Sequence, residues 1–236
     1  MSIKTAVILA AGKGSRLGGR TKEMPKGFLE IGGETLIERS IRLLKKNGIE
    51  KICIGVGHKG SAYEDIKEKY GLIIYYNNEY DTTESMYTLV CAQDMIDEDF
   101  LLLESDLLYD ESALITILGT KDANVILGSG FTDSNDEVYL HRIGEGDTFR
   151  YLSQDVNDRI NSYAELVGIS KISFDLFKKL INLPQIKKMK YEYGFNTLSE
   201  SEDIHIEKHS NLVWCEIDDE HHLNRAINLV YPKLSS

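Results

Sequence analysis

Cysteine is scarce in this sequence of 236 residues, which contains Cys53, Cys91 and Cys215. Their odd number, wide spacing and apolar surroundings argue against a disulfide framework and against a cysteine metal cluster. We interpret them as buried thiols, which favours a reducing, cytoplasmic location. Long apolar runs are also missing: none approaches the ~20 residues that span a bilayer, and the N-terminus leads directly into a strand pattern. We therefore expect no signal peptide and no membrane anchor.

Basic residues are in deficit, with 27 Lys and Arg against 38 Asp and Glu and a net charge of −11. This balance argues against a surface for nucleic acid or an anionic membrane. A site for a polyanion would have to be local. The sequence has only three prolines and shows no internal repeat, and its length fits one large domain over residues 1–236.

Apolar strand patterns alternate with amphipathic helix patterns through the first half of the sequence. This order predicts an α/β fold whose strands are joined by right-handed crossovers into a parallel sheet. Gly48 is the expected stop of the first helix. Strands are expected at residues 5–9, 28–31, 51–56, 72–76 and 100–104, and helices at 36–47, 63–70 and 84–95.

The second half is less regular and predicts more strand than helix. We expect a small β-rich lid, roughly over residues 128–200, that closes over a second substrate. Strands are expected at 125–130, 138–143, 148–153, 163–169, 204–209 and 212–217, and helices at 173–182 and 219–230.

A glycine-containing loop follows the first strand and is the most informative motif. Small residues allow a backbone to approach phosphate oxygens, and its N–H groups can then bind an anion. Arg16 and Lys26 add the cations that a triphosphate requires. The dinucleotide fingerprint is excluded because Leu17 stands where its last glycine belongs. The P-loop motif is excluded as well, because no Gly-Lys-Ser/Thr follows four residues after a glycine. The nucleotide-binding residues predicted here are Leu9, Ala10, Ala11, Gly12, Lys13, Gly14, Ser15, Arg16 and Lys26.

Asp106 directly follows the apolar strand at 100–104, at the same edge of the predicted sheet as the glycine loop. It is the first candidate ligand for Mg²⁺, and Asp218, after the strand at 212–217, is the second. Asp110 and Asp219 are nearby rivals. The alternative for each aspartate is that it caps the following helix.

The motif Leu-Ala-Ala-Gly-x-Gly-x-Arg-Leu at residues 9–17, followed by Pro25-Lys26, resembles the signature of the sugar-phosphate and alcohol-phosphate nucleotidyltransferases. The resemblance implies a Rossmann-like three-layer fold with a mixed, mainly parallel sheet. It implies catalytic roles for Lys26, Arg16 and Asp106, and a Mg²⁺ ion held by Asp106 and an acidic or amide residue near the C-terminal end, which Asp218 matches. Residues near Ser85 and Met86 would meet the base.

The runs at residues 76–89 and 101–109 are similar to those of the small cytidylyltransferases that activate phosphocholine or 2-aminoethylphosphonate. A quaternary ammonium favours an aromatic cage, whereas a primary ammonium favours carboxylates. Asp133, Tyr191, Glu192 and Tyr193 are the expected acceptor-binding residues. The segments 133–139 and 191–194, which contain them, offer more carboxylate than ring face, so CTP and 2-aminoethylphosphonate are the favoured substrates.

Several alternatives stay open at this point. Tyr191 and Tyr193 could form a cage for phosphocholine. A sugar-1-phosphate nucleotidyltransferase and a catalytically silent nucleotide-binding domain of the same fold are further alternatives. The sequence does not decide between a monomer, a homodimer and a fusion to a pathway enzyme.

Overall fold

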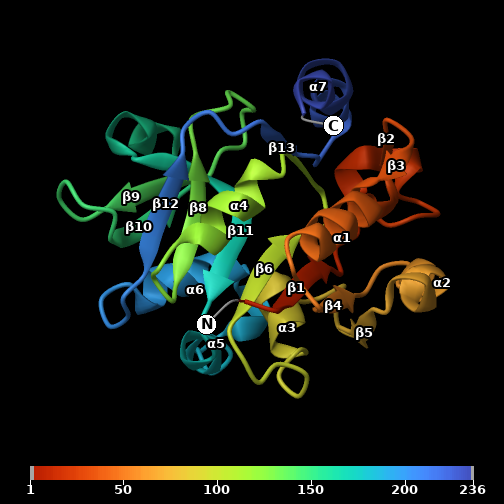
Figure 1. Cartoon of the computed structure of the whole chain (residues 1–236), viewed down its shortest axis with the longest axis horizontal. Coiled ribbons are helices and arrows are strands. Elements are labelled where there is room, and N and C mark those ends of the chain that lie inside the picture. The colour runs from red at the N-terminus through yellow and green to blue at the C-terminus, as the bar shows by residue number, and fades with distance from the viewer. Residues whose placement is uncertain (1–2, 235–236) are drawn as a thin grey trace.

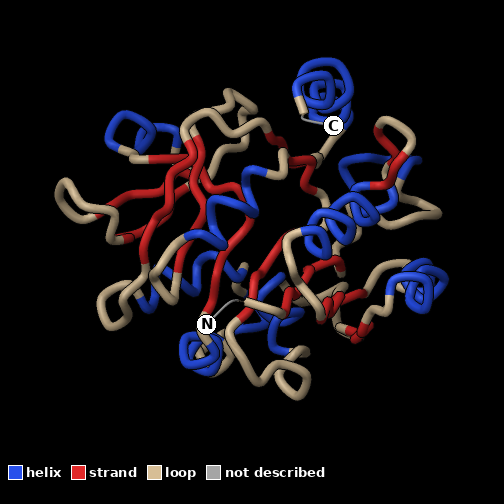
Figure 2. Tube along the Cα trace, in the orientation of Figure 1, coloured by secondary structure: helices blue, strands red, loops and turns tan. Residues whose placement is uncertain are grey.

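The computed structural model describes residues 3–234 and has three layers, with a sheet in the middle and helices on both faces (Figures 1 and 2). The central sheet has nine strands, in the order β10-β9-β11-β6-β1-β4-β5, with β8 paired to β11 and β12 to β8. The Rossmann-like three-layer arrangement predicted from the sequence is confirmed.

The two halves of the sheet differ in strand direction. Strands β6, β1, β4 and β5 run parallel, whereas β11 is antiparallel to β6, β8 and β9. A pair of short strands, β7 and β13, lies outside this sheet. The strands are β1 (Thr5–Ala10), β2 (Glu30–Ile31), β3 (Glu34–Thr35), β4 (Lys51–Val56), β5 (Ile73–Tyr76), β6 (Phe100–Glu104), β7 (Leu107–Tyr109), β8 (Val125–Ser129), β9 (Tyr139–Arg142), β10 (Phe149–Ser153), β11 (Ala164–Ile172), β12 (His205–His209) and β13 (Trp214–Glu216).

Alternate side chains of each central strand enter two different cores. Ile8 of β1 packs in the core that also holds buried residues of α1, α2 and α4, whereas Val7 packs with those of α3, α5 and α6. This alternation is what a strand buried on both faces requires. The helices are α1 (Leu36–Lys46), α2 (Ser61–Tyr70), α3 (Ser85–Val90), α4 (Ser112–Gly119), α5 (Phe174–Leu180), α6 (Tyr191–Leu198) and α7 (Glu220–Arg225).

Helix α1 illustrates how local sequence fixes an element. The Thr35 hydroxyl accepts a hydrogen bond from the Glu38 amide at 3.2 Å, which caps the first turn. Apolar side chains recur along one face and are buried, and the chain leaves the helix at Asn47, followed by Gly48 with φ of 85°. The predicted helix therefore forms almost as expected.

Several elements differ from the prediction. The helix expected over residues 84–95 ends at Val90, and residues 91–95 form turns. Helices α4 and α6 were not predicted. Strands β9, β10 and β11 pair within the central sheet, and the chain from Phe174 to Leu198 is mostly helix and turn. The β-rich part of the expected lid therefore ends near Ile172.

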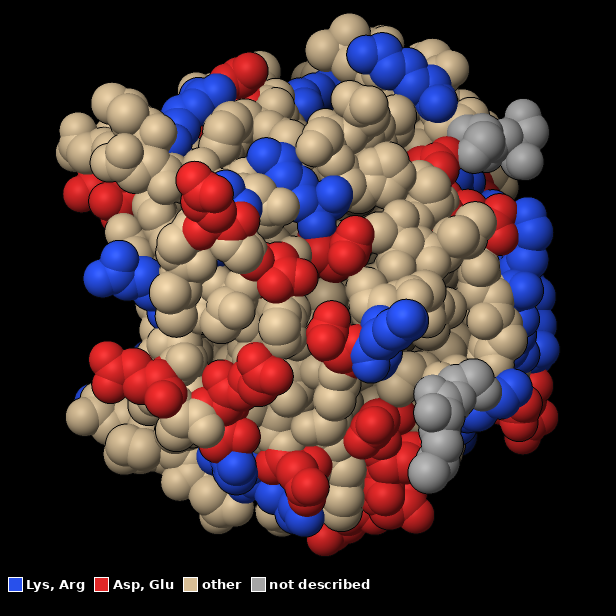
Figure 3. Space-filling view, turned by 60° about the vertical axis from the view of Figure 1, so that its left-hand side comes forward, with Lys and Arg blue, Asp and Glu red and all other residues tan. Residues whose placement is uncertain are grey.

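Charged side chains of both signs are interspersed on the face shown in Figure 3. No helix among residues 3–234 is long and apolar enough to cross a membrane.

Candidate active site

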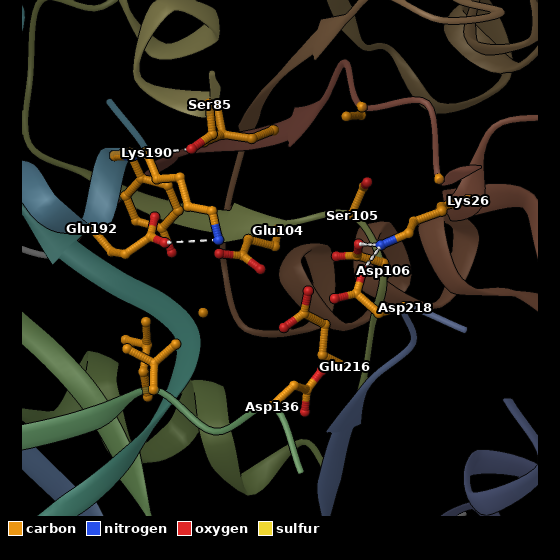
Figure 4. A pocket seen from close by; sticks show the side chains of 18 of the residues that line it. Lys26, Ser85, Glu104, Ser105, Asp106, Asp136, Lys190, Glu192, Glu216 and Asp218 are labelled. Carbon is orange, nitrogen blue, oxygen red and sulfur yellow. Dashed lines mark hydrogen bonds and ion pairs between the residues drawn. The ribbon is translucent and has the colours of Figure 1, made fainter. Parts of the chain in front are cut away.

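A cavity of about 560 Å³ opens where the carboxyl ends of β1 and β6 meet β11, β13 and the start of α6. Figure 4 shows three groups of polar side chains around it. Lys26, Asp106 and Asp218 form one group, Glu104 and Glu216 lie in the middle, and Lys190 and Glu192 lie at the far side. A cavity at the carboxyl ends of parallel strands is the usual ligand site of such sheets.

The glycine loop forms one wall of this cavity. Within residues 3–234, the backbone N–H groups of Gly12, Lys13 and Gly14 donate no hydrogen bond to another part of the chain. They are therefore available to an anion. Gly14 has φ of 61°, and a Cβ there would lie 2.7 Å from Cγ of Lys26. Glycine at position 14 thus allows both the loop conformation and the path of the lysine side chain.

Lys26 joins the two predicted aspartates. Its Nζ donates to Oδ2 of Asp106 at 2.6 Å and also to Asp218, which pairs in turn with Arg16. Burial opposes the charge on Lys26, but Asp106 and Asp218 outweigh it and raise the pKa of the lysine. Burial would raise the pKa of Asp218, yet Lys26 and Arg16 lower it. Lys26 and Asp218 are therefore both charged at neutral pH.

Two further carboxylates that sequence reasoning missed lie beside this cluster. Glu104 and Glu216 each stand two residues before a predicted aspartate, on the same side of the chain. Burial and neighbouring carboxylates raise the pKa of Glu104 to about 8 and that of Glu216 well above its usual value. Gly168, with φ of 81°, leaves room for Glu104, because a Cβ there would lie 3.2 Å from the Glu104 carboxyl carbon. The two-residue spacing was the signal available in the sequence.

The chemistry of these side chains fits a hard divalent cation. Carboxylate oxygens of Glu104, Asp106 and Glu216 lie within 4.8 Å of one another. Oxygen ligands suit a divalent cation such as Mg²⁺, which usually takes one or two carboxylates together with substrate phosphates, so two of the three would be sufficient. Asp218, the second predicted ligand, is held beside them by Lys26. The other two candidates are structural: Asp110 accepts from the Ser112 amide at the start of α4, and Asp219 caps α7.

Not every residue of the predicted nucleotide site lines the cavity. Ser85 lines it, but the Met86 side chain is fully buried in the core between α3 and α6. The prediction that Met86 meets the base is therefore corrected: its side chain packs against α6. Lys13 pairs with Asp81, and Ser15 is exposed; both lie outside the cavity lining. The predicted residues that line the cavity are Leu9, Ala10, Ala11, Gly12, Gly14, Arg16, Lys26, Ser85 and Asp106.

Of the predicted acceptor-binding residues, some line the cavity and others do not. Glu192 and Tyr191 line the cavity, and burial raises the pKa of both. Asp133 instead pairs with Arg159 on the surface, so its predicted contact with the acceptor is corrected. Tyr193 lies outside the lining, with its hydroxyl 3.4 Å from Gln154 Oε1. In the same acidic stretch, Asp136 and Glu137 line the cavity.

The glycine loop and Lys26 predict a nucleotidyltransferase, and the comparison with known protein families agrees with this class of enzyme. Residues 6–124, just over half of the chain, match the family of MobA-like NTP transferase domains. The chain belongs to this family, and its predicted membership among small-molecule nucleotidyltransferases is confirmed.

Relatives and solved structures agree with this assignment. The chain is 23% identical to the CTP:phosphoglutamine cytidylyltransferase of Campylobacter jejuni, over 90% of this chain and 95% of that protein. It is 34% identical to the choline-phosphate cytidylyltransferase of Streptococcus pneumoniae over 41% of this chain and 42% of that one. The 2-aminoethylphosphonate cytidylyltransferase of Lancefieldella rimae is 26% identical over 62% and 63% of the two chains.

A solved inositol-1-phosphate CTP transferase from T. maritima superposes with a TM-score of 0.82, at 17% identity, over 100% of this chain and 99% of that one. The CTP:phosphocholine cytidylyltransferase structure from Streptococcus pneumoniae gives 0.79, at 21% identity, over 95% and 97%. These likenesses establish the fold.

Proposed function

We propose that this protein is a cytidylyltransferase that transfers CMP from CTP to 2-aminoethylphosphonate and releases pyrophosphate. The observation that carries the proposal is the placement of Lys26 between Asp106 and Asp218 at one end of a cavity whose other end is lined by carboxylates. Relatives whose names specify cytidylyl transfer to a phosphocholine or a phosphonate support the choice of CTP.

In the proposed reaction, an anionic phosphonate oxygen attacks the α-phosphorus in line, and the bond to the β-phosphate oxygen breaks as pyrophosphate leaves. The attacking oxygen is already ionised, so the chain has to supply position and charge neutralisation but no general base. Lys26 holds both anions at the α-phosphorus, and Arg16 binds the departing phosphates. A divalent metal ion held by Asp106 with Glu104, Glu216 or Asp218 would supply further charge neutralisation at the phosphates.

We infer the headgroup of the acceptor from the side chains that line the cavity. Carboxylates of Glu137, Glu165 and Glu192 line the cavity, and its lining as a whole holds more carboxylates than aromatic rings. A primary ammonium can donate three hydrogen bonds to such carboxylates. A trimethylated ammonium cannot donate and depends on ring faces that this cavity offers sparingly.

The test compares 2-aminoethylphosphonate with phosphocholine, each with CTP, in the wild type and in Glu192→Gln. We expect the wild type to have the higher kcat/KM with 2-aminoethylphosphonate, because a carboxylate buried against methyl groups forfeits its hydrogen bonds. Neutralising Glu192 should narrow that preference. Phosphocholine as the better wild-type substrate would contradict the acceptor and leave cytidylyl transfer standing.

A further inference from the structure

The segment that carries Lys190 and Glu192 is joined to the segment at the start of α3, about one hundred residues earlier in the chain. The amide of Glu84 donates to the Lys187 carbonyl at 3.0 Å, and that of Met86 donates to the Met189 carbonyl at 3.2 Å. Residues 84–86 and 187–191 therefore run side by side.

The third hydrogen bond of this junction comes from a side chain. The amide of Tyr191 donates to Oγ of Ser85 at 2.9 Å, as the dashed line at Ser85 in Figure 4 marks. Tyr191 is the first residue of α6, and the residue before it, Lys190, provides no side-chain cap. The first amides of a helix need partners from outside it. Ser85 supplies one of them from a distant part of the chain.

Close packing holds the same two helices together. A Cβ at Gly194 of α6 would lie 2.5 Å from Cε of Met86, so the helices meet where glycine leaves space. At the outer edge, Lys187 pairs with Glu79 at 2.6 Å. That pair is exposed and contributes little by itself. The orientation of α6 therefore depends on the buried contacts, on the hydrogen bonds of this junction at its first turn, and on those between Asn196 and Leu152 of β10 further along the helix.

We propose that Ser85 is a positioning residue of the acceptor subsite: its hydroxyl fixes the first turn of α6 and thereby the Glu192 carboxylate. This inference rests on the proposed function, because it takes Glu192 as the group that meets the acceptor headgroup. It replaces the contact with the base that the sequence suggested for Ser85. The Ser85 hydroxyl acts on the acceptor through α6, although the residue lies on the segment predicted to bind the nucleotide.

The kinetic test uses Ser85→Ala and Ser85→Thr with CTP and 2-aminoethylphosphonate. Loss of one such hydrogen bond corresponds to a factor of roughly 2 to 10. We expect Ser85→Ala to raise KM for the acceptor by that factor, with kcat and KM for CTP within about twofold of wild type. Ser85→Thr keeps the hydroxyl and should restore the acceptor KM. Ser173→Ala is the matched control, because it removes a hydroxyl that caps α5, outside the cavity lining.

A raised KM for CTP with an unchanged KM for the acceptor would overturn the proposal. It would indicate instead that Ser85 contacts the base of the nucleotide. Amide hydrogen exchange tests it without turnover: the Tyr191 amide should exchange roughly 2 to 10 times faster in Ser85→Ala than in Ser173→Ala. Equal exchange in the two variants would also overturn it. If no acceptor reacts, the proposed function fails, and the exchange rates still decide whether Ser85 holds α6.

Discussion

Lys26 is the residue on which the site depends most. It is the buried cation between Asp106 and Asp218, and its side chain passes against Gly14 of the glycine loop. A lysine fixed in this way is placed before substrate arrives, so it needs little reorganisation in the transition state.

Replacing Lys26 by Ala should lower kcat by roughly two to three orders of magnitude, the scale for losing one positioned electrostatic donor. The matched control is Lys13→Ala, because Lys13 pairs with Asp81 outside the cavity lining. We expect that control to stay within about threefold of wild type. Steady-state kinetics with saturating substrates and a thermal melt of each variant make the measurement. More than half of wild-type turnover in Lys26→Ala would refute its role.

Gly14 allows a second test at the residue scale. Alanine at this position would have to adopt a positive φ, which costs about 1–2 kcal/mol, and its Cβ would displace Lys26. We therefore expect Gly14→Ala to lower kcat at least tenfold. Gly19→Ala is the control, because its Cβ would meet no atom within 4 Å, its φ is not positive and it lies outside the cavity lining. Equal effects of the two substitutions would show that position 14 has no special role.

At the scale of elements, the strands and the first helix could be predicted because their signals are local. Alternating burial, the Thr35 cap and Gly48 lie within the segments that they define. Helix α6 could not be predicted in this way. Its sequence, Tyr-Glu-Tyr-Gly-Phe-Asn-Thr-Leu, is rich in weak helix formers, and its first turn is completed by Ser85. The apolar sequence of α4 does not distinguish a buried helix from a strand.

The residues of the candidate site also divide into those with a local sequence signal and those without one. Lys26 and Asp106 stand in local motifs and were predicted, whereas Glu165 and Arg225 reach the cavity only because the fold brings distant segments together. Met86 was misplaced because the sequence pattern does not tell which side of a short helix faces the core.

Strand β11 holds the segment 131–137, part of which lines the cavity. The Glu165 carboxylate accepts hydrogen bonds from the Thr132 amide at 2.6 Å and from its hydroxyl at 2.8 Å, and Arg225 donates to the Thr132 carbonyl. Burial is the main reason that the pKa of Glu165 rises to about 7; nearby Glu137 raises it and Arg225 lowers it.

This shift predicts a pH dependence of stability. A carboxyl group whose pKa is higher in the folded state than its usual 4.5 binds its proton more tightly when folded. The free energy of unfolding that this group contributes is therefore lost as the pH rises from about 4.5 to about 7, by at most about 3 kcal/mol. Relative to wild type, Glu165→Gln should gain free energy of unfolding between pH 4.5 and pH 8. Urea denaturation across that range makes the measurement, and parallel curves for the two proteins would contradict the shift.

At the scale of the whole molecule, the chain has a net charge of −11, and its proposed substrate cavity is lined by many carboxylates. A nucleoside triphosphate would be repelled there unless cations are concentrated where the phosphates lie. Lys26 and Arg16 provide part of that charge, and the group of Glu104, Asp106 and Glu216 suits a divalent ion that would add to it. Under the proposed function, the acidic remainder of the cavity would favour an acceptor with a positive headgroup.

The most direct test of nucleotidyl transfer at this cavity is ³¹P NMR of the protein with CTP, Mg²⁺ and 2-aminoethylphosphonate. We predict that the CTP signals are replaced by those of pyrophosphate and of a phosphonate–phosphate anhydride. Asp106→Asn should slow this conversion strongly, because an amide is a weaker ligand for a hard cation than a carboxylate. Unchanged CTP with wild-type protein, for this acceptor and for a panel of phospho-alcohols and sugar phosphates, would contradict the account.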